Sequence, residues 1–422
     1  MKYKKKTLKN GLRIITAPMV GNSTTTVLVL VKAGTDYEDK KNNGISHFIE
    51  HMCFKGTKSR PNAGDIALDL DKLGSQYNAF TGYEYTGYWA KAHYKQGEKL
   101  LEIISDMYMN PIFDENEIIK EKGVILEELN MYKDLPMRQV EEDFLQLLYK
   151  NQPSGMLIVG PKNNIKRFKQ KDFFDYRNKR YTAKNTTIIV SGKFDEKKII
   201  LEIQKKFKNI NSKKSSQKIK TKDIQNKPKI FVRNKKVDQT HLFLGIRAYD
   251  LLNKDVAIVS MIANVLGSGM SSRLFNKLRN EMGVCYYVRA DNESAIDHGF
   301  LALSAGVDTK RTKEVVEVFL NELKKLKEEL VGEEELKKVK DSITGKMYLG
   351  LESSDSIAQY VGFQELLKNK INTPEEKIKK IKAITSQDIK RVANKIFVDK
   401  GLNLALIGPI NDKKSLQKIL KF

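Results

Sequence analysis

Apolar runs recur in the same order in the two halves of this chain. In the first half, the runs at residues 26–33, 88–93 and 186–190 are typical of buried strands. Similar runs follow at residues 241–248, 300–305 and 402–407. In each half a stretch of helical periodicity follows the second run, at residues 96–108 and 312–326. The sequence therefore contains an internal repeat and predicts two homologous domains.

The order of elements within each half is strand, helix, strand pair, helices and strand. This order predicts an α+β fold in which each domain holds a mixed, mostly antiparallel sheet with helices packed on one face. A lysine- and serine-rich stretch at residues 211–228 lacks hydrophobic periodicity and is typical of a linker. We therefore predict an N-terminal domain at residues 1–210, this linker, and a C-terminal domain at residues 229–422. The pattern leaves the strand order within each sheet open.

Composition narrows the class of protein. Of 422 residues, 40% are hydrophobic, and no apolar run is long enough to span a bilayer. The lysine-containing N-terminus has no apolar stretch after it, so we predict no secretory signal and a soluble, cytoplasmic protein without a membrane partner. The two cysteines, Cys53 and Cys285, lack the spacing of a disulfide framework or a thiolate metal site. The net charge of +24 comes mostly from lysines spread along the chain, which favours a solvated surface over specific nucleic-acid binding.

The segment at residues 44–54 predicts a buried helix that polar residues interrupt. His47 and His51 are four residues apart and share one face, so both imidazoles can reach one metal ion. Glu50 lies next to that face, where it can reach a metal-bound water without binding the metal, as a general base must. Two core histidines held by hydrogen bonds would be the structural alternative, but they leave three polar side chains on an apolar helix unexplained.

Catalytic zinc sites usually take three protein ligands, so we expect a third on another element. In the predicted helix at residues 115–131, Glu121, Val124 and Glu128 share one face, and Glu127 points about a third of a turn away. We predict Glu128 as the ligand and Glu121 as the carboxylate that orients a ligand histidine or balances its charge. Helix geometry alone leaves the order of these two glutamates open.

Three segments together resemble a known family. Residues 44–57, 74–81 and 121–128 are similar to the pitrilysin/insulinase family of inverted-motif zinc peptidases, and most of all to its short members, the mitochondrial-processing-peptidase-like group. The resemblance covers essentially the whole chain, because the family is built from two homologous halves of LuxS-like metallohydrolase type. It implies one Zn²⁺ per chain, with Glu128 as the third ligand.

The second half lacks the metal-binding residues. The counterpart of the metal helix, at residues 254–266, contains neither His nor Glu, and an ungapped alignment places Val339 opposite Glu121 and Lys346 opposite Glu128. By resemblance to the family, Arg279 and Tyr286 of this half face the active site, where they would grip a substrate carbonyl or stabilise an oxyanion. Without the family, a surface arginine and a core tyrosine would be the simpler interpretation.

The resemblance also indicates a substrate strand. Asn78, Ala79, Phe80 and Thr81 are similar to the family's edge strand, which pairs with extended peptides through main-chain hydrogen bonds.

Together these features predict a zinc-dependent endopeptidase that hydrolyses extended peptides or unfolded protein segments, with Glu50 activating the water. The resemblance implies a homodimer or a pairing with a related chain. One alternative is a non-catalytic subunit or scaffold of the same fold, and a weaker one is a basic nucleic-acid-binding protein.

Overall fold

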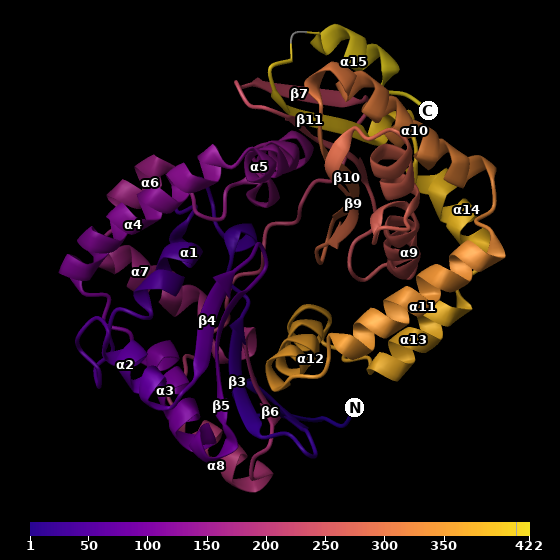
Figure 1. The fold of residues 1–422 in the computed structure, drawn as a ribbon. Helices are drawn as coiled ribbons and strands as arrows, with labels where there is room; N and C mark the ends of the chain where they lie inside the picture. Colours follow the sequence, from indigo (N-terminus) through magenta and orange to yellow (C-terminus); the bar gives the residue numbers. More distant parts are fainter. Residues whose placement is uncertain (411) are drawn as a thin grey trace. The chain divides into compact units, whose positions relative to one another are not determined.

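The computed structural model describes residues 1–410 and 412–422, which form two compact units (Figure 1). The first unit comprises Met1–Leu129, Met156–Ile219 and Tyr348–Thr373. The second comprises Asn130–Gly155, Lys220–Met347 and Pro374–Phe422. Each unit is built around one sheet.

The sheet of the first unit has six strands in the order β1-β2-β6-β3-β5-β4. All neighbouring pairs are antiparallel except β2 with β6, which is parallel. Strand β4 lies at the edge and pairs with β5 alone among the described strands. The strands are β1 (Lys4–Thr7), β2 (Arg13–Pro18), β3 (Thr24–Val31), β4 (Gln76–Thr81), β5 (Thr86–His93) and β6 (Thr186–Gly192).

The second sheet repeats this topology with five strands in the order β7-β11-β8-β10-β9. Again one pair, β7 with β11, is parallel and the others are antiparallel. Position by position, β2-β6-β3-β5-β4 therefore corresponds to β7-β11-β8-β10-β9, and the repeat seen in the sequence is confirmed. The strands are β7 (Lys229–Asn234), β8 (Thr240–Arg247), β9 (Cys285–Ser294), β10 (Gly299–Val307) and β11 (Leu402–Gly408).

Helices surround both sheets, which confirms the predicted α+β class with its mixed, mostly antiparallel sheets. Those before the linker are α1 (Ile45–Met52), α2 (Asp65–Lys72), α3 (Gly97–Met109), α4 (Glu115–Asp134), α5 (Pro136–Tyr149), α6 (Lys162–Arg167), α7 (Gln170–Arg180) and α8 (Glu196–Lys206). Those after it are α9 (Val256–Gly267), the π-helical segment η5 (Phe275–Glu281), α10 (Thr312–Glu328), α11 (Glu333–Leu349), α12 (Ser354–Lys368), α13 (Pro374–Ala383), α14 (Ser386–Ile396) and α15 (Lys413–Ile419). Short 3₁₀ turns complete the chain: η1 (Thr35–Tyr37), η2 (Tyr94–Gln96), η3 (Pro153–Gly155), η4 (Ala183–Asn185), η6 (Thr309–Arg311) and η7 (Asp399–Gly401).

Each sheet is covered on both faces, so the expectation of helices on one face only was wrong. In the first unit, Leu28 and Leu30 of β3 pack on α12, while α3 packs against β3 and β5, with its Gly97 beside Thr25. Because side chains alternate along a strand, Thr25 and the two leucines point to opposite faces. In the second unit, Phe243 of β8 joins the cluster of α5, and its neighbours Leu242 and Leu244 join the larger core.

The two helices on these second faces come from the other half of the sequence. Helix α5 precedes the linker but belongs to the second unit, and α12 follows the linker but belongs to the first (Figure 1). They are counterparts, because α5 follows α4 as α12 follows α11. The predicted division at residues 211–228 stays a prediction about homologous halves, whereas the compact units exchange one helix each.

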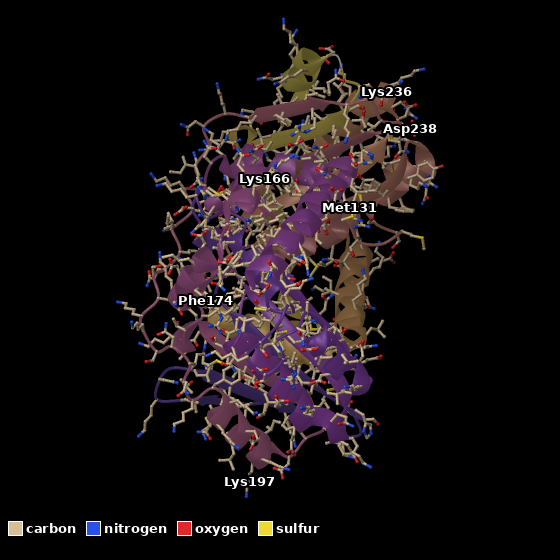
Figure 2. All side chains as sticks on the ribbon, turned by 90° about the vertical axis from the view of Figure 1, so that its left-hand side faces the viewer. Met131, Lys166, Phe174, Lys197, Lys236 and Asp238 are labelled. Atoms are coloured by element: carbon tan, nitrogen blue, oxygen red, sulfur yellow. The ribbon has the colours of Figure 1, made fainter. Side chains whose placement is uncertain are left out.

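The surface carries the lysines that dominate the net charge. Lys166, Lys197 and Lys236 are exposed and point outward from α6, α8 and the turn between β7 and β8 (Figure 2). Among the described helices, none is long and apolar enough to cross a membrane.

Candidate metal centre

Helix α1 begins at a glycine that the fold requires. Gly44 has a φ of 97°, and a side chain there would clash, because an added Cβ would lie 2.5 Å from the carbonyl oxygen of Val159. The buried carboxylate of Glu38 caps the helix, accepting hydrogen bonds from the backbone amides of Gly44 and Ser46, each at 2.8 Å. Burial raises the pKa of Glu38, although these hydrogen bonds act in the opposite direction.

Apolar packing fixes the other side of α1. Phe48 is buried, with its ring centroid 4.8 Å from that of Phe173 and 6.2 Å from that of Phe168. The hydroxyl of Ser46 lies 2.7 Å from that of Tyr176. These contacts orient the helix, so that His47 and His51 project together, with their ring centroids 4.6 Å apart.

Glu128 of α4 completes a three-residue cluster with these histidines. Its Oε1 lies 3.6 Å from Nε2 of His47, and its Oε2 lies 3.6 Å from Nε2 of His51. One ligand atom from each residue lies within 4.8 Å of the other two. The three residues predicted to hold the metal are therefore together in the first unit.

The spacing of these atoms fits a bound ion better than direct hydrogen bonds. At 3.6 Å, each nitrogen–oxygen pair is too far apart for a good hydrogen bond. Two ligands of a tetrahedral zinc ion, each about 2.1 Å from the metal, lie about 3.4 Å apart. Two imidazoles and one carboxylate are also a common ligand set of catalytic zinc. The donor chemistry therefore fits a zinc site, and the two nitrogen–oxygen separations are close to the ligand spacing of one.

The ring nitrogen of His51 that points away from Glu128 contacts the carboxylate of Glu121, which is paired with Lys55. Its Nδ1 lies 2.9 Å from Oε1 of Glu121, so a proton on Nδ1 leaves the lone pair of Nε2 facing Glu128. Oε2 of Glu121 lies 2.7 Å from Nζ of Lys55. Burial works against ionisation of both partners. Nevertheless His51 and Lys55 lower the pKa of Glu121, whereas Glu121, Glu50 and Glu128 together raise the pKa of His51.

The other histidine has a different environment. Burial, followed by the charge of His51, lowers the pKa of His47 to about 3, so this imidazole is neutral at ordinary pH. Within the described residues, its buried Nδ1 has no hydrogen-bond partner. A neutral imidazole is the form that binds a metal ion.

Glu50 lies beside the cluster without belonging to it. Its Oε2 accepts a hydrogen bond of 2.5 Å from the hydroxyl of Thr81, on the edge strand β4. Burial is the largest influence on this carboxyl and raises its pKa, assisted by the charge of Glu128, while Thr81 and His51 oppose the shift. A raised pKa suits a general base that works near neutral pH.

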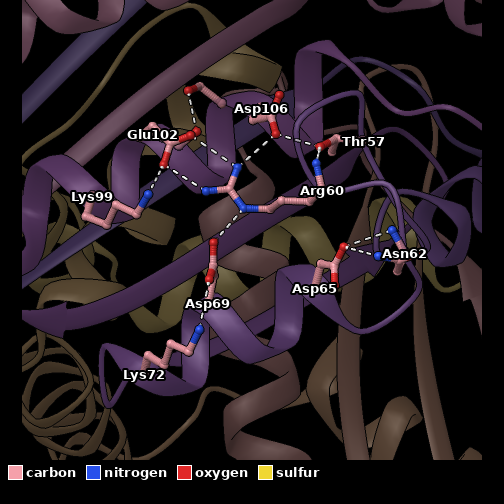
Figure 3. A network of polar contacts seen from close by, with 10 residues as sticks. Thr57, Arg60, Asn62, Asp65, Asp69, Lys72, Lys99, Glu102 and Asp106 are labelled. Atoms are coloured by element: carbon pink, nitrogen blue, oxygen red, sulfur yellow. Dashed lines mark hydrogen bonds and ion pairs between the residues drawn. The ribbon is translucent and has the colours of Figure 1, made fainter.

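The loop after α1 is fixed by a buried arginine (Figure 3). Arg60 donates to Asp69 of α2 at 2.9 Å and to Glu102 and Asp106 of α3, with shortest distances of 2.9 Å to each. Thr57 also donates to Asp106, at 2.6 Å. Burial alone would lower the pKa of Arg60, but the three carboxylates raise it, so the guanidinium stays charged. This network ties the loop that carries Lys55 to two helices of the first unit.

The remaining predicted residues lie in two places. Asn78, Ala79, Phe80 and Thr81 form the end of edge strand β4 in the first unit, as expected. Arg279 and Tyr286 lie in the second unit, where the guanidinium stacks 5.0 Å from the tyrosine ring centroid and donates to the carbonyl of Cys285 at 2.8 Å. Tyr286 is 75% exposed, so it is not a core residue. That these two residues face the active site stays a prediction.

Sequence reasoning missed three side chains that support the centre: Glu38, Lys55 and the Thr81 hydroxyl. Lys55 lies one helical turn beyond His51, which was the available signal. Thr81 was predicted only as a substrate contact, and Glu38 gave no local signal because its partners lie across a turn. Val124, placed with Glu121 on an inward face, is 51% exposed. Glu128 beside it is also partly exposed, so this end of the face is open to solvent.

Comparison with known proteins agrees with this arrangement. The family model described as insulinase (peptidase family M16) matches residues 13–162, and the model described as peptidase M16 inactive domain matches residues 167–343. A Bacillus subtilis protein named "Uncharacterized zinc protease YmxG" is 31% identical over 412 residues, which cover 98% of this chain and 100% of that protein. The mitochondrial-processing peptidase subunit beta of Mus musculus is 31% identical over 415 residues, which cover 96% of this chain and 84% of that protein.

Solved structures show the same fold. The crystal structure of a protease from Helicobacter pylori superimposes with a TM-score of 0.89 at 24% identity, covering 97% of this chain and 99% of that one. A structure from Pseudomonas fluorescens, titled as a peptidase M16 inactive domain, gives a TM-score of 0.90 at 16% identity and covers 98% of this chain. The family models match residues 13–162 and 167–343, and the two relatives at 31% identity match 98% and 96% of the chain, so this chain belongs to the insulinase family of peptidases, peptidase family M16.

Proposed function

We propose that this protein is a zinc-dependent endopeptidase that cleaves extended peptides or unfolded protein segments. The observation that carries the proposal is the placement of Glu50 beside three convergent side chains that could hold a metal ion. Relatives along the full length of the chain are named zinc proteases, which supports the same metal.

One zinc ion per chain would be held by Nε2 of His47, Nε2 of His51 and the carboxylate of Glu128. When bound, zinc supplies Lewis acidity, which polarises a peptide carbonyl and makes water a better nucleophile near neutral pH. Glu121 keeps His51 in the tautomer that offers Nε2, and Lys55 keeps Glu121 ionised.

Glu50 performs the proton transfers in this proposal. Its carboxylate takes a proton from the attacking water and later gives one to the leaving amine, so the same group acts as base and then as acid. The hydroxyl of Thr81 occupies one of its two oxygens and limits the orientations that the carboxylate can adopt.

The edge strand β4 would bind the peptide. Its outer edge can pair with an extended segment through main-chain hydrogen bonds, which require little sequence preference. Because Thr81 lies on this strand and contacts Glu50, a peptide paired there would pass beside the base. Contributions from Arg279 and Tyr286 to carbonyl binding, and assembly as a homodimer or with a related chain, are further parts of the proposal. Size determination in solution tests the assembly.

A scaffold of the same fold is the second candidate, because one of the two matching family models describes an inactive domain. That model covers residues 167–343, whereas the metal cluster and Glu50 lie outside this range. Three side chains that could hold a metal ion, with Glu50 beside them, support the peptidase.

The deciding experiment compares wild type and Glu50→Gln on a mixture of unstructured peptides, with the zinc content of both measured. We expect both proteins to bind one zinc per chain and the variant to lose activity by at least about 100-fold, because Glu50 moves protons without binding metal. Glu127→Gln, on the exposed face of α4, is the matched control and should behave as wild type. Equal activity of wild type and Glu50→Gln, or wild type without zinc, would contradict the proposal.

A further inference from the structure

Strand β4 touches functional groups on both of its faces. Successive side chains of a strand point to opposite faces, so Thr81 and Phe80 face different neighbours. Thr81 points toward α1 and donates to Glu50 at 2.5 Å. Phe80 points toward α12, with its ring centroid 5.7 Å from that of Phe363. Strand β4, which is predicted to pair with a peptide, thus lies between α1, which carries Glu50, and α12, which comes from the other half of the chain.

The contacts of Phe363 hold the end of the β4–β5 hairpin. Its ring centroid is 4.7 Å from that of Tyr85, and the rings of Phe80 and Tyr85 are 6.0 Å apart, so the three rings form one cluster. Opposite Phe80 in the register stands Gly87, where an added Cβ would lie 2.3 Å from the Phe80 ring. The glycine therefore makes room for the ring, which lies across β5.

Helix α12 is itself fixed closely on the sheet. At Gly362 an added Cβ would lie 2.8 Å from a methyl group of Leu30, so the helix approaches as near as a glycine allows. At its first turn, the hydroxyl of Ser354 lies 2.8 Å from that of Thr26, and Asp355 pairs with Lys91 at 2.8 Å. A helix anchored in this way can act as a fixed support for Phe363.

We propose that Thr81 is a positioning residue for Glu50, and that Phe363 of α12 holds strand β4 where Thr81 can reach the base. This inference rests on the proposed peptidase function, and it gives the C-terminal half a part in catalysis that requires no metal ligand. Residues 354–368 lie beyond both ranges that the family models match, so neither model describes this role.

The first test compares Thr81→Val, which keeps the branched shape but removes the donor, with Thr81→Ser, which keeps the donor. We expect Thr81→Val to lower kcat roughly tenfold with KM within about twofold, because a misplaced base slows chemistry more than binding. Thr81→Ser should restore most of the activity. If Thr81 had a purely structural role, both variants would have a lower melting temperature, and kcat would not fall selectively in Thr81→Val. A wild-type kcat in Thr81→Val would overturn the inference.

A second readout needs no activity. In chelator-treated protein, the unfolding equilibria of wild type, Thr81→Val, Glu50→Ala and the double variant form a double-mutant cycle, in which each single variant removes one partner of the hydrogen bond. We expect a coupling of roughly tenfold in the equilibrium constant, because a hydrogen bond to a charged group is among the stronger kinds. Additive effects would mean that Thr81 does not hold Glu50. If wild type were inactive, the proposed function would fail, and this cycle alone would decide whether the contact exists.

The support from α12 is tested through Phe363→Leu. We expect kcat to fall about threefold in the wild-type background and to change little in Thr81→Val, since the contact through which the support acts is then already lost. Tyr360→Phe, on the same helix, removes only a hydroxyl that donates to the carbonyl of Asn372 and is the matched control. Equal effects of Phe363→Leu in both backgrounds would show that the helix does not act through Thr81.

Discussion

The two units place different chemistry at equivalent positions of one topology. In the first, Glu121 of α4 is a buried carboxylate that contacts His51 and Lys55. In the second, the ungapped alignment puts Val339 of α11 at that position, where it is buried in the apolar core. Seven residues further on, Glu128 faces two histidines, whereas Lys346 donates to the hydroxyl of Ser268 at the surface.

The preceding helices differ in the same way. In helix α1, two buried or half-buried positions are occupied by the histidines His47 and His51, and a third by Glu50. Its counterpart α9 is apolar over nearly its whole length and contains neither His nor Glu. A buried carboxylate costs several kcal/mol unless it is paired, so the first unit depends on partners that the second does not need. The same topology therefore forms in the second unit without these side chains, so the candidate metal site is additional to the fold.

Exchanging Glu128, the proposed third ligand, for the lysine at its counterpart position should abolish tight zinc binding in the first unit. In Glu128→Lys, an ammonium group replaces the carboxylate between His47 and His51. We expect zinc affinity to fall by more than about 100-fold, because even the loss of an outer partner of a ligand costs 10- to 100-fold. Isothermal titration with zinc measures this loss.

Glu127→Lys makes the same charge change one residue earlier, at an exposed position, and should keep the affinity of wild type. Retention of stoichiometric zinc in Glu128→Lys would remove Glu128 from the ligand set.

The reverse exchange should damage the second unit instead. Val339→Glu puts a carboxylate into an apolar core without the His51 and Lys55 that pair Glu121 in the first unit. We expect a loss of about 3 kcal/mol in the free energy of unfolding, since an unpaired buried charge is among the costliest substitutions. Urea denaturation measures it, with Val339→Ala as the control that removes volume and adds no charge. A cost no larger than that of Val339→Ala would show that this position tolerates charge.

The sequence predicted those parts of the site that follow from spacing within one element. His47 and His51 share a face because a helix repeats every 3.6 residues. The edge strand at residues 78–81 was expected only from the resemblance to the family. The resemblance to the family decided between Glu121 and Glu128, which helix geometry left open.

The parts of the site and fold that the sequence did not predict depend on contacts between segments that are distant in the sequence. Glu38 caps α1 only because the chain turns back between them, and Thr81 meets Glu50 only because β4 lies beside α1. The hydrophobic pattern could not predict that α5 belongs to the second unit and α12 to the first, because each helix has an apolar face that could cover either sheet. Phe363 could not be connected with Phe80 for the same reason.

The pH dependence of zinc affinity should show that His51 and His47 differ in pKa. The pKa of His51 is raised above its ordinary 6.5, so protons compete with zinc at this residue as pH falls through that raised value. The pKa of His47 is lowered to about 3, so it stays neutral over the same range. We expect affinity to fall about tenfold per pH unit below the pKa of His51, as for one competing proton, in chelator-competition measurements.

In Glu121→Gln, the fall should begin at lower pH, because one of the three carboxylates that raise the pKa of His51 is gone. A slope of two protons per zinc in wild type would mean that both histidines titrate together.

The smallest effect on stability is expected from Lys346→Glu, which gives the second unit the residue that the first has at its counterpart position, Glu128. Lys346→Glu removes one hydrogen bond to Ser268 from an exposed side chain, so the free energy of unfolding should change by less than about 0.5 kcal/mol. Zinc stoichiometry should stay at that of wild type, because α9 offers no imidazole to pair with the new carboxylate. A second bound zinc would show that the second unit supplies metal ligands from elements other than α9. If none binds, a glutamate at the position of Glu128 is not enough for a metal site, since it also needs two histidines opposite it, as His47 and His51 are in the first unit.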